Sequence, residues 1–259
     1  MKVNLNVSGF ETEATFPDAD VKRIHQPLIE KFTRLYHEKQ ERIVVFLCAP
    51  PGSGKSTLAA FWEYLSEQDE NQEPLQVLPF DGFHYPNEIL DSNTIERNGE
   101  IVPLRSIKGS YETFNLTELI DKLKQLKVKD SKWPYYDRNL HDPVDDAILV
   151  NRNVVVVEGN WLLLNEPVWN ELHRLADFTV FVDTQPEFLQ ERLVNRKIRG
   201  GTEPEAALEF YLNSDAVNVD VAFSTISATP STPTTCLANF AIGKLKLPTP
   251  QNKSKTLSP

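Results

Sequence analysis

Apolar and polar side chains alternate over residues 2–16, in two runs that are separated by Ser8-Gly9. Alternation with a period of two indicates half-buried strands, and a Ser-Gly pair between two such runs is typical of a hairpin turn. From Asp18 to about Lys39, apolar residues recur at helical spacing, which predicts a helix. We therefore expect residues 1–40 to form a hairpin and a helix that pack on the rest of the molecule.

Further along the chain, apolar runs rich in β-branched residues predict strands. They occupy residues 42–48, 75–80, 153–158 and 178–183. Continuous apolar runs of this length are typical of strands buried on both faces of a parallel sheet. The first run is followed by a predicted helix over residues 55–67, and strands that alternate with helices indicate an α/β fold.

Residues 85–152, between the second and third runs, form a segment far longer than a strand–helix–strand crossover requires. Part of the segment predicts an amphipathic helix, and Asn115 and Glu118 stand three residues apart, as an N-cap and its capping-box partner do. The apolar face of this helix consists of Leu116, Leu119, Ile120, Leu123 and Leu126. Because α/β proteins usually place substrates at the carboxyl edge of the sheet, we expect a substrate site in this insertion.

The strongest chemical signal is the sequence APPGSGKST, between the first predicted strand and the first helix after it. It fits the phosphate-binding loop G-x-x-x-x-G-K-[ST], with alanine in the first position. Its glycines allow backbone N–H groups to surround a phosphate, Lys55 reaches the β- and γ-phosphates, and the Ser56 hydroxyl ligates Mg²⁺. The expected nucleotide-binding residues are Ala49, Pro50, Pro51, Gly52, Ser53, Gly54, Lys55, Ser56 and Thr57.

Two acidic residues end predicted strands at the edge that carries this loop. Glu158 can hold Mg²⁺ there, directly or through water, although a solvated carboxylate is the structural alternative. Asp81 can orient an acceptor hydroxyl and take its proton, although an Asx turn is the alternative. His84 is as consistent with a structural role as with a substrate contact.

Residues 186–201 predict a helix on which Arg192, Arg196 and Arg199 form one narrow stripe. Guanidinium groups can neutralise a transferring γ-phosphoryl group, and Gly200-Gly201 would act as the hinge of a lid. A solvated basic face is the alternative, but a lid is favoured beside a phosphate-binding loop.

Composition narrows the classes of function. The formal charge of −10 and the pI of about 5.1 disfavour binding to nucleic acid or to an anionic membrane surface. We expect no membrane span and no secretory signal, because no sufficiently long apolar run is present. Cys48 and Cys236 have no spacing typical of a disulfide framework or metal site, so a reduced, cytoplasmic protein is expected.

Residues 221–259 lack Asp, Glu and Arg and predict a mostly disordered tail, with a short strand possible over 238–247.

Several segments, in order along the chain, resemble the uridine kinase/phosphoribulokinase/pantothenate kinase group of P-loop kinases. Within that group, the chain is most similar to the branch labelled nucleoside/nucleotide kinase family or fructose-transport-associated kinase. Besides the phosphate loop and the Arg-rich helix, the segments are LPFDGFHYPN (79–88), KGSYETFN (108–115), YYDRNLHDPV (135–144) and VVVVEGNWLLL (154–164). The resemblance implies a kinase domain over residues 41–220, a parallel 2-3-1-4-5 sheet, Mg·ATP as phosphoryl donor and a small hydroxyl compound as acceptor.

By the same resemblance, Asp81 matches the family's acid after the second strand, Glu158 the metal-associated acid, and Arg192 and Arg196 the lid arginines. With Lys55, Asp81 and these arginines form the expected catalytic set. The residues expected on the acceptor side are His84, Lys108, Tyr136, Asp137, Arg138 and His141, and Asp215 with Asn218 fits a stretch near the base or the lid. The polar ending after residue 220 departs from the family pattern, and an altered reading frame and a divergent tail both remain open as explanations.

Three functions are therefore weighed, of which a small-molecule kinase is favoured. A regulatory GTPase or motor ATPase is disfavoured, because the chain lacks an N-K-x-D stretch and Asp81-Gly-Phe-His is not D-x-x-G. A non-catalytic ATP-binding protein, impaired by its altered C-terminus, is the remaining alternative. The acceptor can be nucleoside-, sugar- or pantothenate-like, and a homodimer is left open.

Overall fold

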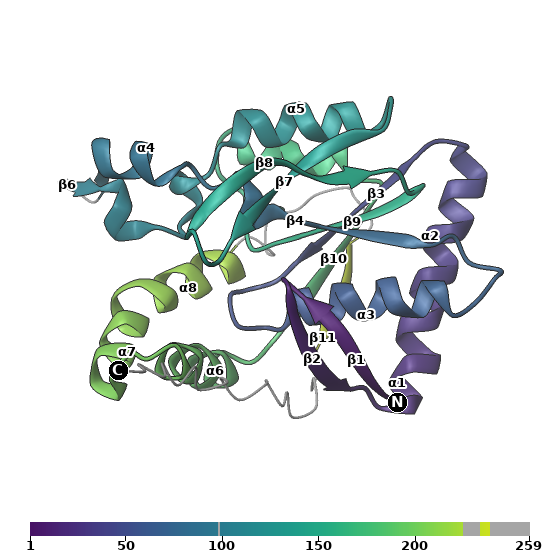
Figure 1. The fold of residues 1–259 in the computed structure, drawn as a ribbon, viewed down its shortest axis with the longest axis horizontal. Helices are drawn as coiled ribbons and strands as arrows, with labels where there is room; N and C mark the ends of the chain where they lie inside the picture. Colours follow the sequence, from purple (N-terminus) through teal and green to yellow (C-terminus); the bar gives the residue numbers. More distant parts are fainter. Residues whose placement is uncertain (98, 225–233, 239–259) are drawn as a thin grey trace, which may run out of the picture.

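The computed structural model describes residues 1–97, 99–224 and 234–238, and its centre is a five-stranded parallel sheet (Figure 1). The strands are β3 (Ile43–Cys48), β4 (Leu75–Pro79), β9 (Val154–Gly159), β10 (Phe178–Asp183) and β11 (Thr234–Ala238). Their order across the sheet is β11-β10-β3-β9-β4. Read from the β4 edge, this is the order 2-3-1-4-5, so the α/β fold and the sheet topology implied by the resemblance are confirmed.

The central strand β3 separates two apolar cores. Its alternate side chains Val45 and Leu47 face a core that includes α2 (Gln26–Lys39) and α3 (Lys55–Glu67). Val44 and Phe46 face a second core, built with α5 (Leu116–Leu126). All six residues of β3 are buried, which explains why its sequence is continuously apolar rather than alternating.

The N-terminal residues form the predicted hairpin, with β1 (Lys2–Val7) antiparallel to β2 (Phe10–Thr15). The predicted helix follows as α1 (Asp18–Asp20), a π-helical segment η1 (Val21–His25) and α2. The hairpin packs beside α3, where the ring of Phe16 stacks on Phe61 with 3.6 Å between centroids. The N-terminal elements therefore lie against the helix that follows the phosphate loop (Figure 1).

The long insertion between β4 and β9 contains more than the predicted helix α5. Its further elements are η2 (Phe80–Phe83), α4 (Asn87–Ser92), β5 (Thr94–Arg97), β6 (Glu100–Pro103), η3 (Leu104–Ile107), η4 (Tyr111–Thr113), β7 (Ser131–Asp137) and β8 (Asp142–Val150). The capping box of α5 is confirmed: Asn115 Oδ1 accepts from the Glu118 backbone N–H at 3.2 Å, and Asn115 Nδ2 donates to Glu118 Oε2 at 2.9 Å. The two antiparallel hairpins, β5–β6 and β7–β8, were not part of the sequence prediction.

The chain after β9 is mostly helical up to Ser224. The elements are η5 (Trp169–Leu175), α6 (Pro186–Arg199), α7 (Pro204–Phe210), the π-helical η6 (Tyr211–Asp215) and α8 (Ala216–Ser224). Two parts of the segment predicted as a mostly disordered tail form regular structure. The end of α8 extends into this segment, and β11 pairs in parallel with β10. Backbone pairing explains the strand, because the outer edge of β10 otherwise presents unpaired N–H and C=O groups. The strand expected over 238–247 lies, from residue 239 on, outside the described residues.

Within the described part of the chain, none of the helices has the length and apolar character that crossing a bilayer would require.

Candidate active site

The phosphate loop lies between β3 and α3, and its two glycines hold conformations that other residues rarely adopt. Gly52 has φ of 79° and Gly54 has φ of 90°, both in the left-handed region. Gly54 is the N-cap of α3. A Cβ at Gly52 would lie 2.9 Å from Leu193 Cγ, so α6 packs directly on the loop. The glycines are therefore required both for the curvature of the loop and for the close approach of the predicted lid helix.

At the start of α3, two loop residues meet the acid at the end of β9. Ser56 Oγ donates to Glu158 Oε1 at 2.9 Å, and Lys55 Nζ lies 3.9 Å from Glu158 Oε2. Glu158 is 6% exposed. Burial raises the pKa of Glu158, with Lys55 opposing the rise and the charge of Asp81 adding to it. The structure thus brings together the three side chains expected at a nucleotide–metal site.

The donor set here fits a hard divalent cation. Glu158 Oε2 is buried and accepts no hydrogen bond from any described residue. A serine hydroxyl and a carboxylate are oxygen donors of the kind that Mg²⁺ binds, and this ion usually keeps water and phosphate ligands as well. The described residues contain no group of three or more His, Cys, Asp or Glu side chains that could hold a metal by themselves. A cation here would have Ser56 and Glu158 as its protein ligands, beside water and phosphate oxygens.

Asp81 lies in η2, just after β4, and is half-buried among positive charges. Burial favours its neutral form, but the charges of His84, Lys55, Arg138 and Arg196 hold the pKa of Asp81 below its ordinary value. Asp81 is consequently a carboxylate at neutral pH. Both acids thus lie in the same electrostatic field as Lys55.

The backbone beside Asp81 is packed too tightly for any residue but glycine. A Cβ at Gly82 would overlap the backbone of Pro134 in β7, and one at Gly159 would lie 2.6 Å from Phe80 Cβ. The indole of Trp133 donates to the Pro79 carbonyl at 2.9 Å. These contacts fix η2 and β7 against each other, and so fix the position of Asp81 relative to the β7–β8 hairpin.

His84 lies between Asp81 and the acceptor-side hairpin. Its Nδ1 is 2.8 Å from the Asp81 carbonyl oxygen. Its ring centroid lies 3.9 Å from that of Phe114 and 5.1 Å from that of Tyr136. Burial lowers the pKa of His84 and raises the pKa of the Tyr136 hydroxyl. Both predicted acceptor-side residues thus lie in one cluster next to Asp81.

The three arginines of the predicted stripe on α6 have different contacts. Arg192 Nη1 lies 3.4 Å from the Gly52 carbonyl oxygen and 3.3 Å from that of Ser53, so this arginine contacts the phosphate loop itself. Arg196 is exposed, and its charge acts on Asp81 and on the buried Asp215. Arg199 instead donates from Nε to the Asn195 carbonyl of its own helix, at 3.1 Å. Arg192 therefore contacts the phosphate loop and the charge of Arg196 acts on Asp81, whereas Arg199 contacts its own helix.

Asp215, predicted near the base or the lid, is buried where η6 ends, and Asn218 is buried in α8. Asp215 Oδ2 accepts no hydrogen bond from a described residue, and burial raises the pKa of Asp215 against the charges of Arg196 and Lys197. Both residues thus lie in the helical layer that carries the arginines.

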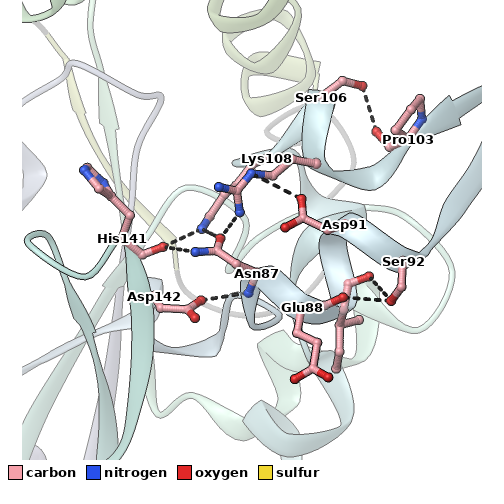
Figure 2. A network of polar contacts seen from close by, with 11 residues as sticks. Asn87, Glu88, Asp91, Ser92, Pro103, Ser106, Lys108, His141 and Asp142 are labelled. Carbon is pink, nitrogen blue, oxygen red and sulfur yellow. Dashed lines mark hydrogen bonds and ion pairs between the residues drawn. The ribbon is translucent and has the colours of Figure 1, made fainter.

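The remaining acceptor-side predictions lie on and around the β7–β8 hairpin. Lys108 Nζ donates to Asn87 Oδ1 at 2.7 Å and to the His141 carbonyl at 2.9 Å (Figure 2). The imidazole of His141 points away from these contacts, so this residue contributes its backbone rather than its ring. Asp137 Oδ1 accepts from the backbone N–H groups of Asn139 and Leu140, at 2.7 and 3.0 Å, which makes it a turn-capping residue here. Arg138 is exposed, and its charge acts on Asp81 and Glu158.

One part of the site was not found from the sequence. A cavity of about 330 Å³ lies between the turn of the N-terminal hairpin and the phosphate loop, lined among others by Ser8, Gly9, Ser56, Tyr135 and Glu158. Tyr135 Oη donates to the Ser8 carbonyl at 3.2 Å. The Ser8-Gly9 pair predicts the turn, but no sequence signal indicates where the turn packs.

Known proteins resemble this chain over most of its length. The sequence model described as "Phosphoribulokinase / Uridine kinase family" matches residues 44–216. The protein YggC of Escherichia coli (strain K12), named as uncharacterized, is 43% identical over 221 residues, which are 85% of this chain and 90% of that protein. A proposed uridine kinase of Schizosaccharomyces pombe is 28% identical over 210 residues, covering 76% of this chain and 87% of its own. The crystal structure of a proposed fructose transport system kinase from Silicibacter sp. TM1040 superposes with a TM-score of 0.69 at 28% identity, covering 83% of this chain and 97% of that one.

Proposed function

Because the chain belongs to the phosphoribulokinase/uridine kinase family, a family of small-molecule kinases, we propose that it transfers the γ-phosphoryl group of Mg·ATP to a hydroxyl group of a small molecule. The observation that carries the proposal is the convergence of Lys55, Ser56, Glu158 and Asp81 at one edge of the sheet. A second, separately held carboxylate can orient an acceptor hydroxyl and take its proton. Asp81 supplies that carboxylate on the side of the β7–β8 hairpin.

The register of the sheet supports this division of labour between the two acids. Glu158 pairs with Leu47 of β3 and with Pro79 of β4, so it lies between the strand that enters the phosphate loop and the strand that leads to Asp81. Glu158, with Ser56, would hold Mg²⁺ on the nucleotide side. Mg²⁺ bound there would neutralise charge on the phosphate oxygens.

The transfer itself requires positioning and charge neutralisation more than covalent chemistry. Lys55 binds the β- and γ-phosphates, and Arg192 and Arg196 approach the transferring group from α6. Asp81 accepts a hydrogen bond from the acceptor hydroxyl and takes its proton as the new P–O bond forms. Because the pKa of Asp81 is held low, it is ionised and able to orient the hydroxyl before transfer.

The experiment that tests the proposal is a coupled assay of ADP release with a panel of nucleosides, sugars and pantothenate-like acids. We expect one class of acceptor to stimulate ADP release, and EDTA to abolish it. In Asp81→Asn, acceptor-stimulated turnover should fall by about 10²- to 10⁴-fold, the usual contribution of a general base. Binding of Mg·ATP, measured by calorimetry, should persist in this variant.

Asp121→Asn is the matched control, because Asp121 is an exposed residue of α5 and should leave turnover unchanged. Full turnover in Asp81→Asn would show that Asp81 is not the base. Folded wild-type protein that binds Mg·ATP but responds to no acceptor would favour the non-catalytic alternative. Folded protein that gives no heat with Mg·ATP would refute nucleotide binding altogether.

A further inference from the structure

The turn of the N-terminal hairpin is fixed on the helix that follows the phosphate loop. Ser8 and Gly9 have φ of 52° and 85°, as the two central residues of a type I′ turn require. Asn6 Oδ1 accepts a further hydrogen bond from the backbone N–H of Gly9, at 3.0 Å. At the other end of the hairpin, the ring of Phe16 stacks on Phe61 of α3. The turn is therefore held in place relative to α3, the helix that starts with the predicted phosphate-binding lysine.

The same turn contacts β7 on the acceptor side. Tyr135 Oη donates to the Ser8 carbonyl oxygen at 3.2 Å, and this bond joins residues that are 127 positions apart in the sequence. A Cβ at Gly9 would lie only 3.4 Å from the Tyr135 hydroxyl, which shows how closely the turn approaches the ring. The turn and Tyr135 line the cavity of about 330 Å³ together with Ser56 and Glu158. The hairpin turn and the predicted metal-binding residues thus face the same cavity.

The strand β7 packs in turn against the segment that carries Asp81. Tyr135 and Tyr136 are consecutive, so their side chains point to opposite faces of the strand. Tyr136 faces His84, with 5.1 Å between the ring centroids, and His84 Nδ1 lies 2.8 Å from the Asp81 carbonyl oxygen. The backbones also touch, because a Cβ at Gly82 would lie 2.9 Å from the backbone nitrogen of Tyr135. A displacement of β7 would therefore reach Asp81 by direct contact.

We propose that the N-terminal hairpin fixes the distance between the nucleotide side and the acceptor side of the site, with Tyr135 as the positioning residue. This inference rests on the proposed kinase function, and it gives a role to a hairpin that lies outside residues 44–216, the part of the chain that matches the family. The sheet joins the two sides through β3, β9 and β4, and the hairpin adds a second connection, from α3 through the turn to β7. Phosphoryl transfer depends on this alignment, because a small misplacement of the reacting groups costs a large factor in rate.

The first test measures this alignment on the full-length protein, without requiring turnover. Co²⁺ replaces Mg²⁺ in the complex with a non-hydrolysable ATP analogue, and ¹⁵N-labelled protein then shows pseudocontact shifts, which depend on the distance and direction of each amide from the metal. Tyr135→Phe removes the hydroxyl that bonds to Ser8 and keeps the ring. We expect the pseudocontact shifts of the amides in β7 and at His84 to change beyond the error of the measurement, and those in β3 to stay the same.

Tyr36→Phe is the matched control, because Tyr36 lies on α2 and its hydroxyl bonds to no described residue. This variant should leave all the pseudocontact shifts unchanged. Unchanged shifts in β7 of Tyr135→Phe, or equal changes in the two variants, would overturn the inference. An ATP analogue that fails to move the amide signals near Gly54 would instead refute the proposed nucleotide site, and the inference with it, so the two failures are distinguishable.

The second test uses the acceptor that the panel of nucleosides, sugars and pantothenate-like acids identifies. Tyr135→Phe should lower the single-turnover rate constant of transfer by about two- to tenfold, the range that the loss of one neutral hydrogen bond gives, with the Kd of Mg·ATP unchanged. In the Asp81→Asn background, the same substitution should have little further effect, because Tyr135 acts by placing Asp81. A rate constant that is unchanged in Tyr135→Phe, or a loss of equal size in both backgrounds, as a purely structural role would produce, would contradict the inference.

Discussion

The close packing of α6 on the phosphate loop makes Gly52 sensitive to the smallest substitution. In Gly52→Ala, the added Cβ would lie 2.9 Å from Leu193 Cγ and 3.3 Å from Leu193 Cδ2, at a residue whose φ is 79°. Two effects therefore add. A side chain in the left-handed region costs about 1–2 kcal/mol, and overpacking a buried leucine costs about 1–3 kcal/mol. The free energy of unfolding should fall by about 2–5 kcal/mol in total.

A matched control separates these effects. Gly99 has φ of 82°, but a Cβ there would meet no atom within 4 Å. Gly99→Ala should therefore lower the free energy of unfolding only by the conformational cost of about 1–2 kcal/mol. The difference between the two variants, about 1–3 kcal/mol, reports the contact with Leu193 alone. Urea denaturation of both proteins measures it.

The same substitution should affect the nucleotide site. To relieve the contact, either the loop or α6 must move, and Arg192 moves with them because it contacts the carbonyls of Gly52 and Ser53. We expect calorimetry to show affinity for Mg·ATP at least about tenfold lower in Gly52→Ala, and unchanged in Gly99→Ala. The reasoning is refuted if both variants lose the same stability and both bind Mg·ATP as the wild type does.

Two further predictions concern polar contacts that stabilise the fold. The Asp177 carboxylate is 5% exposed and accepts from Lys39, Lys127 and the Val44 backbone N–H; although burial opposes it, these bonds lower the pKa of Asp177. The stabilisation by this carboxylate is therefore present above the ordinary pKa of aspartate and is lost as the pH falls through the lowered pKa. In Asp177→Asn, the free energy of unfolding should fall by about 3–5 kcal/mol at pH 7. Urea denaturation should show that the difference from the wild type shrinks in acid. Tyr135→Phe removes the hydrogen bond to Ser8 and should lower the free energy of unfolding by about 0.5–1.5 kcal/mol. The control is Tyr36→Phe, which should change this free energy little, because the Tyr36 hydroxyl bonds to no described residue. Equal effects of the two substitutions would contradict the assignment.

The phosphate loop was predictable because its chemistry is local. A buried strand, two glycines, a lysine and a serine follow one another within a few residues, and each is required by the conformation that surrounds a phosphate. The structure confirms both the flanking elements and the left-handed glycines. The positions of Glu158 and Asp81 were predictable for a similar reason, since each lies at the carboxyl end of a predicted strand, at the same edge of the sheet.

The acceptor side was less predictable because its contacts join segments distant in the sequence. Lys108 donates hydrogen bonds to Asn87 and His141, and no periodic pattern in the sequence indicates that these residues are close. The hairpins β5–β6 and β7–β8 contain prolines and charged residues, which weaken the usual signals for strands. The turn that contains Ser8 was predicted from the sequence. Its hydrogen bond with Tyr135 was not, because the tertiary fold alone brings these two residues together.

The order of the strands explains why the two acids of the site behave differently. β9 lies between β3 and β4, so Glu158 is enclosed on both sides and its pKa rises, whereas Asp81 lies beyond the end of β4, among cations, and its pKa falls. Each carboxylate also acts on the other, because protonating Glu158 removes a negative charge from the surroundings of Asp81. A cation held by Glu158 and Ser56 would lower the pKa of both acids by the same Coulombic effect. The negative charge of a bound triphosphate would oppose this effect, so the neighbouring protein cations are what keep Asp81 in the ionised form that orients the acceptor.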